Sequence, residues 1–424
     1  MTWVNRARRV SALLLIALAA ALGLASGASA VVPDPGGDAT IDQPVPVSGK
    51  LLGVALGADP DRTGGQLTSA IAAMQAAGIT HYRDSISWND FRGYVSPTVP
   101  VPSFFDPVTT PIGTTTGVPA ELISLDRRYT ALVSAGITPV YTNTGAPVWS
   151  SRYAPCAKNG TLWATLNYSL CAQWLSYGSS KQGYHPTAAF YPQFQLWVKA
   201  VARRYPAAII EGWNEPDGQF RGQTTAWGWQ GIASQPEELA EEHCQLYAAV
   251  KSVDPNRIVL SPAFGDTEGT PWYIPGFTTA VGSDRTCWDR FSLHAYVGTT
   301  ITGDDTPLAR LFQITRDARS GISDTTPIWV TEFGLSTTDK AHSSQPANNT
   351  EADQKAVVRG LYNKFMAMSD VQAAFPFSLR DNWDIDAGTS TSPKWGYGLA
   401  RTDWTPKLAF CHFVGQAGNT YTGC

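Results

Sequence analysis

The feature that most constrains the fold is an alternation of short apolar runs with longer amphipathic segments along almost the whole chain. Short apolar runs that end at Gly, Pro or a polar cluster are typical of buried strands. Eight such runs predict strands over Leu51–Leu56, Ile79–Asp84, Ile137–Asn143, Ala208–Asn214, Ile258–Ala263, Arg290–Ala295, Pro327–Glu332 and Ala374–Leu379.

The segments between these runs carry apolar residues at helical spacing. Helical patterns are found over Leu67–Met74, Leu122–Val133, Phe194–Val201, Leu239–Val250, Leu308–Ser320, Val358–Met368 and Lys407–Val414. Alternating strands and helices favour parallel βα units. We predict an α/β fold, a single-domain (β/α)8 TIM barrel with long βα loops, and a doubly wound open sheet is the alternative architecture.

The first thirty residues are predicted to be a targeting segment. Arg6 and Arg8 precede the apolar stretch Ser11–Leu24, and Ala-Ser-Ala at 28–30 closes it. A basic start, an apolar centre and a small-residue cleavage site are the parts of a secretory signal peptide. We therefore expect the protein to be secreted.

A retained membrane anchor is the alternative for this segment. The apolar stretch is short for a membrane span, which needs about 20 residues, and no later segment of the sequence qualifies. We expect residues 1–30 to be the signal peptide, residues 31–48 to be an N-terminal lead-in rich in Pro and Gly, and residues 49–424 to form one domain.

All six cysteines lie beyond the predicted signal peptide. An even number of cysteines in an exported chain is typical of disulfides. A structural zinc site is the alternative, but no two cysteines have the close CxxC spacing that such sites use. We expect neighbouring cysteines to pair, as Cys156–Cys171, Cys244–Cys287 and Cys411–Cys424.

The charge balance argues against several classes of partner. The net charge is −4, charged residues make up 16% of the chain, and no long basic run is present. A protein that binds nucleic acid usually concentrates Lys and Arg on one surface. We therefore expect no nucleic-acid partner, and no membrane partner.

Two of the predicted strands end at a polar cluster that contains one glutamate. Glu215 lies in the string EGWNEPDG, and Glu332 lies in IWVTEFGLS. In an α/β barrel the carboxyl ends of the strands share one face, and active sites lie there. Two carboxylates at that face are the pair that hydrolysis of a glycosidic bond requires. The alternative is that each glutamate is an ordinary carboxylate in a surface loop.

These motifs resemble those of glycoside hydrolase clan A. WNEP at 213–216 and TEFG at 331–334 are similar to the acid/base and nucleophile signatures of that clan. The segments 79–88, 292–296 and 398–407 resemble its second strand, its sixth strand with His-x-Tyr and its closing segment. Within the clan, the sequence is nearest to family 39 and to family 5 cellulase-like enzymes. The resemblance implies a retaining TIM-barrel catalytic domain over nearly all of the predicted mature chain.

The resemblance also implies roles for individual residues. Glu332 corresponds to the nucleophile and Glu215 to the acid/base. A retaining enzyme needs the first ionised and the second protonated at the start, about 5–5.5 Å apart. The donor must then act as a base once the nucleophile is glycosylated.

Four polar residues are expected around this pair on the same resemblance. Asn214 would bind the sugar 2-hydroxyl, and Arg83 would keep the nucleophile ionised. Tyr296 would donate a hydrogen bond to the nucleophile, and His294 would line the pocket. A strand-end cap, a surface cation and ordinary strand packing are the alternative interpretations of these residues.

Tryptophans are candidate platforms for sugar rings, although each alone is better explained by core or loop packing. The candidates are Trp149, Trp227, Trp229, Trp383 and Trp395, and of these we expect Trp149 and Trp383 to bind the substrate. Many clan members have a tryptophan inside strand eight, where this chain has Phe375-Pro376-Phe377. Either Trp383 takes over this role or the subsite that holds the sugar has a different shape.

The sequence thus predicts a secreted retaining glycosidase that acts on a β-linked oligo- or polysaccharide. The mechanism requires no cofactor and no metal. Asp266 and Glu268 could bind a calcium ion, but they are better explained as solvated acidic residues in a loop. A transglycosylase with the same two glutamates and a non-catalytic carbohydrate-binding barrel are the alternative functions.

Overall fold

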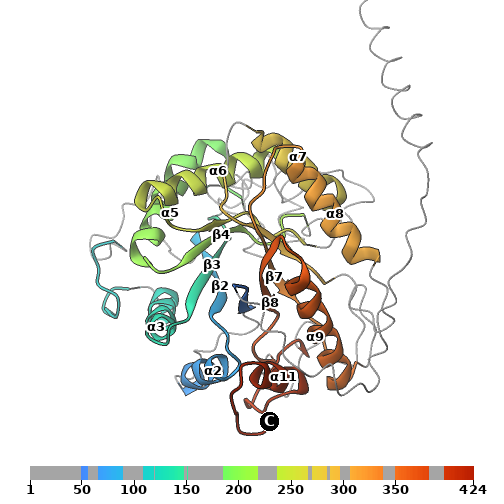
Figure 1. Ribbon diagram of the computed structural model, residues 1–424. Coiled ribbons are helices and arrows are strands. Elements are labelled where there is room, and N and C mark those ends of the chain that lie inside the picture. Colours follow the sequence, from blue (N-terminus) through green and yellow to red (C-terminus); the bar gives the residue numbers. More distant parts are fainter. Residues whose placement is uncertain are drawn as a thin grey trace, which may run out of the picture. The chain divides into compact units, whose positions relative to one another are not determined.

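The computed structural model describes most of the chain beyond the predicted leader. The described residues are 49–55, 65–88, 108–118, 120–147, 150, 185–217, 236–265, 270–283, 287–296, 306–337, 349–381 and 396–424. The predicted signal peptide and lead-in lie outside them. Figure 1 shows the strands in the centre of this part, with the helices arranged around them.

The strands form one parallel sheet that closes on itself. Its order is β5-β4-β3-β2-β1-β8-β7-β6, and every ladder between neighbours is parallel. The bounds are β1 Leu51–Ala55, β2 His81–Ser87, β3 Thr138–Thr144, β4 Ile209–Trp213, β5 Val259–Leu260, β6 Phe291–His294, β7 Ile328–Phe333 and β8 Val371–Pro376. Single bridges Leu260↔Arg290 and Phe264↔Leu293 join β6 to β5 and the residues that follow it. The predicted (β/α)8 barrel is confirmed, and the open doubly wound sheet is wrong.

Helices lie between the strands as the helical patterns predict. Their bounds are α2 Gly65–Ala76, α3 Ala120–Ser134, α5 Tyr191–Arg204, α6 Pro236–Val253, α7 Thr270–Val281, α8 Thr306–Ser320, α9 Glu351–Ala367 and α11 Leu408–Gln416. Of these, α7 was not predicted, because Pro271, Pro275 and Gly276 resemble helix breakers. Pro271 instead occupies the first turn, where its missing N–H has no helical partner to lose.

Strands β8 and β5 differ from their predicted limits for identifiable reasons, and β2 runs three residues beyond its predicted end at Asp84. Strand β8 starts three residues early, because Gln372 is satisfied inside the sheet by Arg290 Nε at 2.7 Å and Trp329 Nε1 at 3.0 Å. Strand β5 is only two residues long. Pro262 follows soon after it and cannot donate a ladder hydrogen bond.

The barrel interior is apolar at the amino ends of the strands. A small cluster fills it, made of Val140, Ile209, Leu260, Trp329, Ala373 and Phe375. Gly53 gives this cluster its room, since a Cβ on Gly53 would lie 2.2 Å from the Phe375 ring. The larger core lies between the strands and the helices. Period-2 alternation places the next inward layer two residues further along, where β3, β4 and β7 supply the polar residues Thr142, Glu211 and Thr331.

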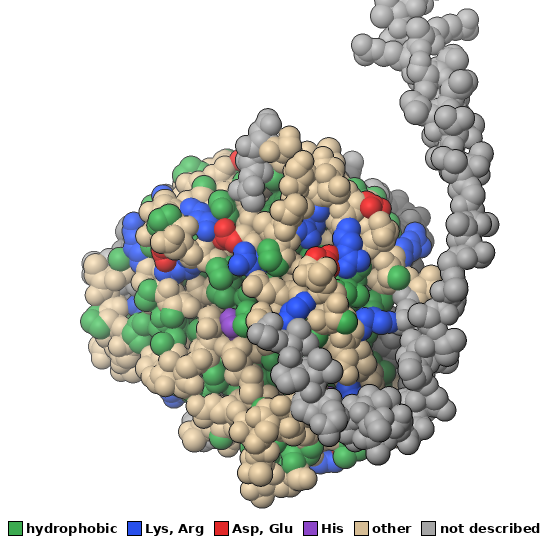
Figure 2. Space-filling view, in the orientation of Figure 1, with side chains coloured by type: hydrophobic (Ala, Val, Ile, Leu, Met, Phe, Trp, Pro, Cys, Tyr) green, Lys and Arg blue, Asp and Glu red, His purple; other side chains and the backbone are tan. Residues whose placement is uncertain are grey.

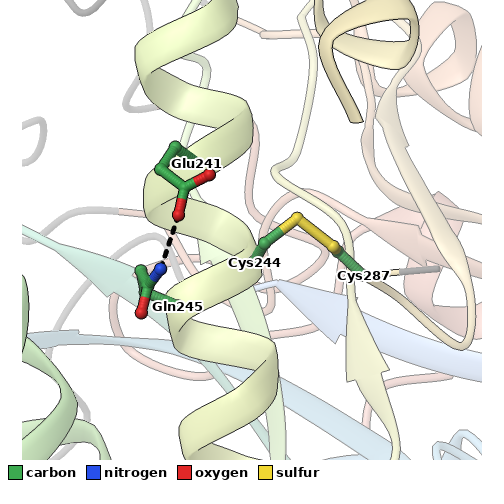
Figure 3. The surroundings of a disulfide bond; sticks show 4 residues. All are labelled: Glu241, Cys244, Gln245 and Cys287. Atoms are coloured by element: carbon green, nitrogen blue, oxygen red, sulfur yellow. Dashed lines mark hydrogen bonds between the residues drawn. A yellow bond between two sulfur atoms is a disulfide. The ribbon is translucent and has the colours of Figure 1, made fainter. Parts of the chain in front are cut away.

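Two of the three predicted disulfides are confirmed. Cys244 on α6 bonds Cys287, just before β6, with Cα atoms 5.0 Å apart (Figure 3). The bond therefore ties the helix that precedes β5 to the segment that precedes β6. Cys411 on α11 bonds Cys424. The predicted pair Cys156–Cys171 lies outside the described residues.

The described surface carries mixed charge. Figure 2 shows one face, on which basic and acidic side chains lie interspersed among polar and apolar ones. Within the described ranges, no helix combines the length and the apolar character that a membrane crossing requires.

Candidate active site

The two candidate glutamates lie at the carboxyl ends of their strands, on the same end of the barrel. Glu332 is the fifth residue of β7. Glu215 follows the end of β4 by two residues, and its backbone N–H donates to Ala263 O at 2.8 Å. Glu215 has φ of 43°, in the left-handed region that few residues other than glycine adopt. Such outliers cluster at functional sites, where the surrounding structure holds them.

The carboxylates face one another across the barrel. One oxygen of Glu215, one oxygen of Glu332 and a ring nitrogen of His294 all lie within 4.8 Å of one another. The two side chains differ in exposure, with 34% of the Glu215 side chain accessible against 11% for Glu332. The pair thus combines a shielded carboxylate with one that solvent reaches.

Glu332 is surrounded by hydrogen-bond donors. Arg83 Nη1 donates to its Oε1 at 2.5 Å, and the Tyr296 hydroxyl donates to its Oε2 at 2.7 Å. His294 pairs with Glu332 in the β6–β7 register, and its Nε2 lies 3.6 Å from Oε1. Both oxygens of Glu332 are therefore held in place by donors from other parts of the barrel.

Arg83, on β2, connects three residues of the site. Its Nη2 donates to Asn214 Oδ1 at 2.8 Å, and its Nε donates to Glu211 Oε2 at 2.6 Å. Burial opposes its charge, but Glu211 and Glu332 outweigh that effect and raise the pKa of Arg83. The contact to Asn214 also fixes the side-chain amide of Asn214, whose oxygen faces Arg83.

Glu211 is the site residue that sequence reasoning missed. It is fully buried on β4, and it also accepts hydrogen bonds from Thr142 and, at 2.6 Å, from Ser292 Oγ. Burial raises the pKa of a carboxyl, but the charge of Arg83 and these hydrogen bonds lower the pKa of Glu211 below its ordinary value. The available signal was period 2, since Glu211 follows the inward-facing Ile209 by two residues.

His294 contacts the other glutamate as well. Its Nδ1 lies 2.8 Å from Glu215 Oε1, and the ring is fully buried. Burial opposes a charged imidazole, but Glu332 and the hydrogen bond to Glu215 raise the pKa of His294 above its ordinary value. The ring therefore contacts Glu215 directly and lies beside Glu332 without a hydrogen bond to it.

An aromatic cluster borders Tyr296. The rings of Phe377 and Tyr397 lie 6.3 Å and 5.7 Å from that of Tyr296, and 5.5 Å from each other. Burial, followed by the charge of Glu332, raises the pKa of Tyr296 well above its ordinary value, so it remains a donor. Phe375 faces the barrel floor, and Phe377, half-buried, is the strand-eight aromatic at the mouth.

The structure therefore brings six of the predicted site residues together, and two cannot be placed. The six are Arg83, Asn214, Glu215, His294, Tyr296 and Glu332. Trp149 and Trp383 lie outside the described residues, as do Trp227, Trp229 and Trp395. Those tryptophans remain predictions.

Glu215, His294 and Glu332 are also the donors that a metal ion would find here. Both oxygens of Glu332 already accept hydrogen bonds, and Arg83 places a positive charge 2.5 Å from Oε1. A cation at the same point would face that charge at close range. The donor set is therefore better suited to proton transfer and nucleophilic chemistry than to holding a metal.

A closed parallel barrel with converging carboxylates on β4 and β7 defines a class of enzyme, the (β/α)8 barrels that act at the carboxyl ends of their strands. Residues 173–391, slightly more than half of the chain, match the family model described as glycosyl hydrolase catalytic core. The chain belongs to this family. No curated protein matches the sequence.

Several solved glycosidases share the fold. A family 39 glycoside hydrolase from Bacteroides cellulosilyticus WH2 is similar over 89% of this chain and 66% of its own, with a TM-score of 0.52 and 18% identity. An exo-β-1,4-mannosidase from Opitutaceae bacterium strain TAV5 is similar over 87% of this chain and 59% of its own, with a TM-score of 0.50 and 16% identity. For Bacteroides uniformis β-glucuronidase 2 the shares are 86% and 34%, the TM-score 0.50 and the identity 14%. This chain is thus shorter than each of these proteins.

Proposed function

We propose that this protein is a secreted retaining glycosidase that hydrolyses β-linked oligo- or polysaccharides, with Glu332 as nucleophile and Glu215 as acid/base. The observation that carries the proposal is the approach of the two carboxylates to within 4.8 Å at the carboxyl ends of β4 and β7. Retaining enzymes hold their carboxyl groups about 5–5.5 Å apart, whereas inverting enzymes leave about 6.5–9.5 Å for a water molecule.

The surroundings of each glutamate support its proposed role. Arg83 and Tyr296 each donate to one oxygen of Glu332, which holds the carboxylate in a fixed orientation toward the barrel mouth. Glu215 lies 2.8 Å from His294 Nδ1, and its side chain is more exposed than that of Glu332. An exposed carboxyl can exchange its proton with a leaving group and then with water.

In the first step, an oxygen of Glu332 forms a bond to the anomeric carbon while the bond from that carbon to the leaving oxygen breaks. Glu215 gives its proton to that oxygen. In the second step, Glu215 takes a proton from water, whose oxygen displaces Glu332. Asn214 supports both steps by donating its amide N–H to the sugar 2-hydroxyl.

The test compares Glu332→Ala and Glu215→Ala on activated aryl β-glycosides, with azide added. The panel includes β-glucuronides and β-mannosides, because solved enzymes of similar fold bear those names. Loss of the nucleophile should leave almost no turnover, and azide should give the inverted α-glycosyl azide. Loss of the acid/base should leave partial activity on good leaving groups, and azide should give the retained β-glycosyl azide.

Glu237→Ala, at an exposed position in the first turn of α6, is the matched control and should keep full activity. If the two azide products are exchanged between the variants, the roles are reversed. If neither variant loses activity, the paired-carboxylate mechanism is wrong. Transfer to an added sugar instead of water would identify a transglycosylase, and binding without turnover would identify a carbohydrate-binding barrel.

A further inference from the structure

The guanidinium of Arg83 is shared between two buried carboxylates. Its Nε donates to Glu211 at 2.6 Å and its Nη1 donates to Glu332 at 2.5 Å. Only one of these carboxylates, Glu332, is proposed to take part in bond formation. The inference below rests on that proposed function and concerns what the second carboxylate does.

The charge of this trio changes during the reaction. Before attack, one cation and two carboxylates carry a net charge of −1. When Glu332 forms its ester with the sugar, that carboxylate becomes neutral, so Arg83 is left with Glu211 alone. A buried guanidinium without a counter-ion is strongly disfavoured. Glu211 is therefore the group that keeps Arg83 paired in the covalent intermediate.

We propose that Glu211 is a positioning residue that acts as the permanent counter-ion of Arg83. In the free enzyme, Glu211 neutralises Arg83, so that the negative charge of Glu332 is not cancelled. In the glycosyl-enzyme, where Glu332 is an uncharged ester, Glu211 still neutralises Arg83 and thereby stabilises the intermediate. Through Arg83 it also holds the amide of Asn214 in one orientation.

The geometry around Glu211 suits this role. Three strands hold it in place, since Arg83 comes from β2, Thr142 from β3 and Ser292 from β6. Ser292 is itself fixed by Thr331 Oγ1 at 2.6 Å, next to the nucleophile in sequence. The side chain of Glu211 is fully buried, so it is not placed to meet the substrate directly. The lowered pKa of Glu211 fits a carboxylate that stays ionised throughout.

Removal of the negative charge of Glu211 should slow formation of the glycosyl-enzyme and speed its hydrolysis. With Glu211→Gln, Arg83 would pair with Glu332 alone in the free enzyme and would lose its counter-ion in the intermediate. Glycosylation should therefore slow by about 100-fold or more, and the intermediate should decay faster. In steady state, KM should rise, because less intermediate accumulates.

The acidic limb of the profile of kcat/KM against pH should move to lower pH. That limb reports ionisation of Glu332 in the free enzyme. In Glu211→Gln, Arg83 has Glu332 as its one carboxylate partner of the trio, so the ionised form of Glu332 is favoured relative to the wild type. The charged and titratable groups that the structure places against Glu332 are Arg83, Glu215, His294 and Tyr296, and those against Glu211 are Arg83 and His294. All of them remain in the variant.

The experiment uses the full protein and 2,4-dinitrophenyl 2-deoxy-2-fluoro-β-glycosides of glucose, xylose, mannose and glucuronic acid. Mass spectrometry first identifies the sugar that labels Glu332 in the wild type. Stopped reactions then give the labelling rate and the lifetime of the labelled enzyme for wild type and Glu211→Gln. We expect slower labelling, a shorter lifetime and the shifted acidic limb together.

Glu211→Asp keeps the charge, so its acidic limb should stay near that of the wild type and its labelling rate should lie between the other two. If Glu211→Gln does not fold, the double variant Thr142→Val/Ser292→Ala replaces it. This variant keeps the charge but loosens its support, and it should slow labelling about tenfold.

A purely structural role of Glu211 would lower the active fraction but leave the lifetime and the acidic limb in place, and that result would overturn the inference. An unchanged labelling rate in Glu211→Gln, or in the double variant if it is used, would also overturn it. If no probe labels Glu332 in the wild type, the proposed function fails instead, so the two failures are distinguishable.

Discussion

The hydroxyl of Tyr296 donates to Glu332 Oε2 at 2.7 Å, and its raised pKa keeps the proton on the phenol. Hydrogen bonds to charged groups contribute about 1.5–3 kcal/mol. Tyr296→Phe should therefore lower kcat/KM on aryl glycosides by about 10- to 100-fold, with the fold intact. Tyr362→Phe on α9, which packs on Phe413, is the matched control and should be neutral. A loss in Tyr362→Phe as large as in Tyr296→Phe would point to a packing effect instead.

His294 predicts a pH-dependent contribution to stability. Because the folded-state pKa of His294 is raised, its contribution is complete below the unfolded value of about 6.5. It disappears as pH rises through the raised folded-state pKa. His294→Gln should thus lose more unfolding free energy at pH 6 than at pH 8.5, as urea titrations would measure.

His81 gives the opposite trend and serves as the comparison. Burial lowers the pKa of His81 to about 4. Folding therefore favours its neutral form, and stability is lost as pH falls from about 6.5 toward 4. His81→Gln should remove that loss. If His81→Gln and His294→Gln showed the same pH trend, the sign derived for His294 would be wrong.

Among single residues, those in the catalytic motifs could be predicted from the sequence, but the buried residues that hold them in place could not. Glu215 and Glu332 stand at the ends of apolar runs, so a local pattern identifies them. Glu211 lies inside such a run, and its partners Arg83 and Ser292 are far away in sequence. Nothing local indicates that a buried carboxylate is paired, because the pairing exists only after the strands close.

Among the elements, the strands followed from local pattern, while helix α7 did not. Its sequence contains two prolines and a glycine, which local propensity counts against a helix. Burial of Tyr273, Ile274 and Phe277 overrides that propensity. Tertiary packing of this kind is not visible in a single window of sequence.

The two disulfides should stabilise the chain unequally. Cys244–Cys287 closes a loop with a sequence separation of 43, and Cys411–Cys424 closes one of 13. The chain-entropy relation gives about 4 kcal/mol for the longer loop and about 3 kcal/mol for the shorter one. The double Ser variant of the first pair should therefore unfold at lower urea than that of the second. The reverse order would show that native-state strain or residual structure dominates.

For the whole molecule, the number of βα units was predictable and the way the barrel closes was not. Strands β2 and β3 share seven residue pairs, whereas β5 and β6 meet through single bridges. The junction between β5 and β6 therefore has no continuous ladder, although hydrogen bonds cross it on both sides of Pro262. No apolar pattern encodes which neighbouring strands pair irregularly.

This junction should open more readily than the rest of the barrel. Amide hydrogens across it, such as Ser261 N–H to Arg290 O at 2.9 Å and His294 N–H to Phe264 O at 2.7 Å, should exchange sooner than those between β2 and β3. Loss of Cys244–Cys287, which ties the two flanking segments together, should speed that exchange further. Hydrogen exchange read by mass spectrometry would check both expectations, and uniform protection around the barrel would contradict them.

The closing junction also has a consequence for how the protein acquires activity during folding. By the shorter way around the barrel, the path from β4, with Glu215, to β7, with Glu332, crosses the junction between β5 and β6. An assembling chain can form the long ladder from β5 through β1 to β6 before these ends meet, with nearly all of its secondary structure in place. The carboxylates would then still be apart. In refolding, recovery of the helical circular dichroism signal should precede recovery of turnover. The return of activity would then report the moment at which β5 and β6 pair and the barrel closes.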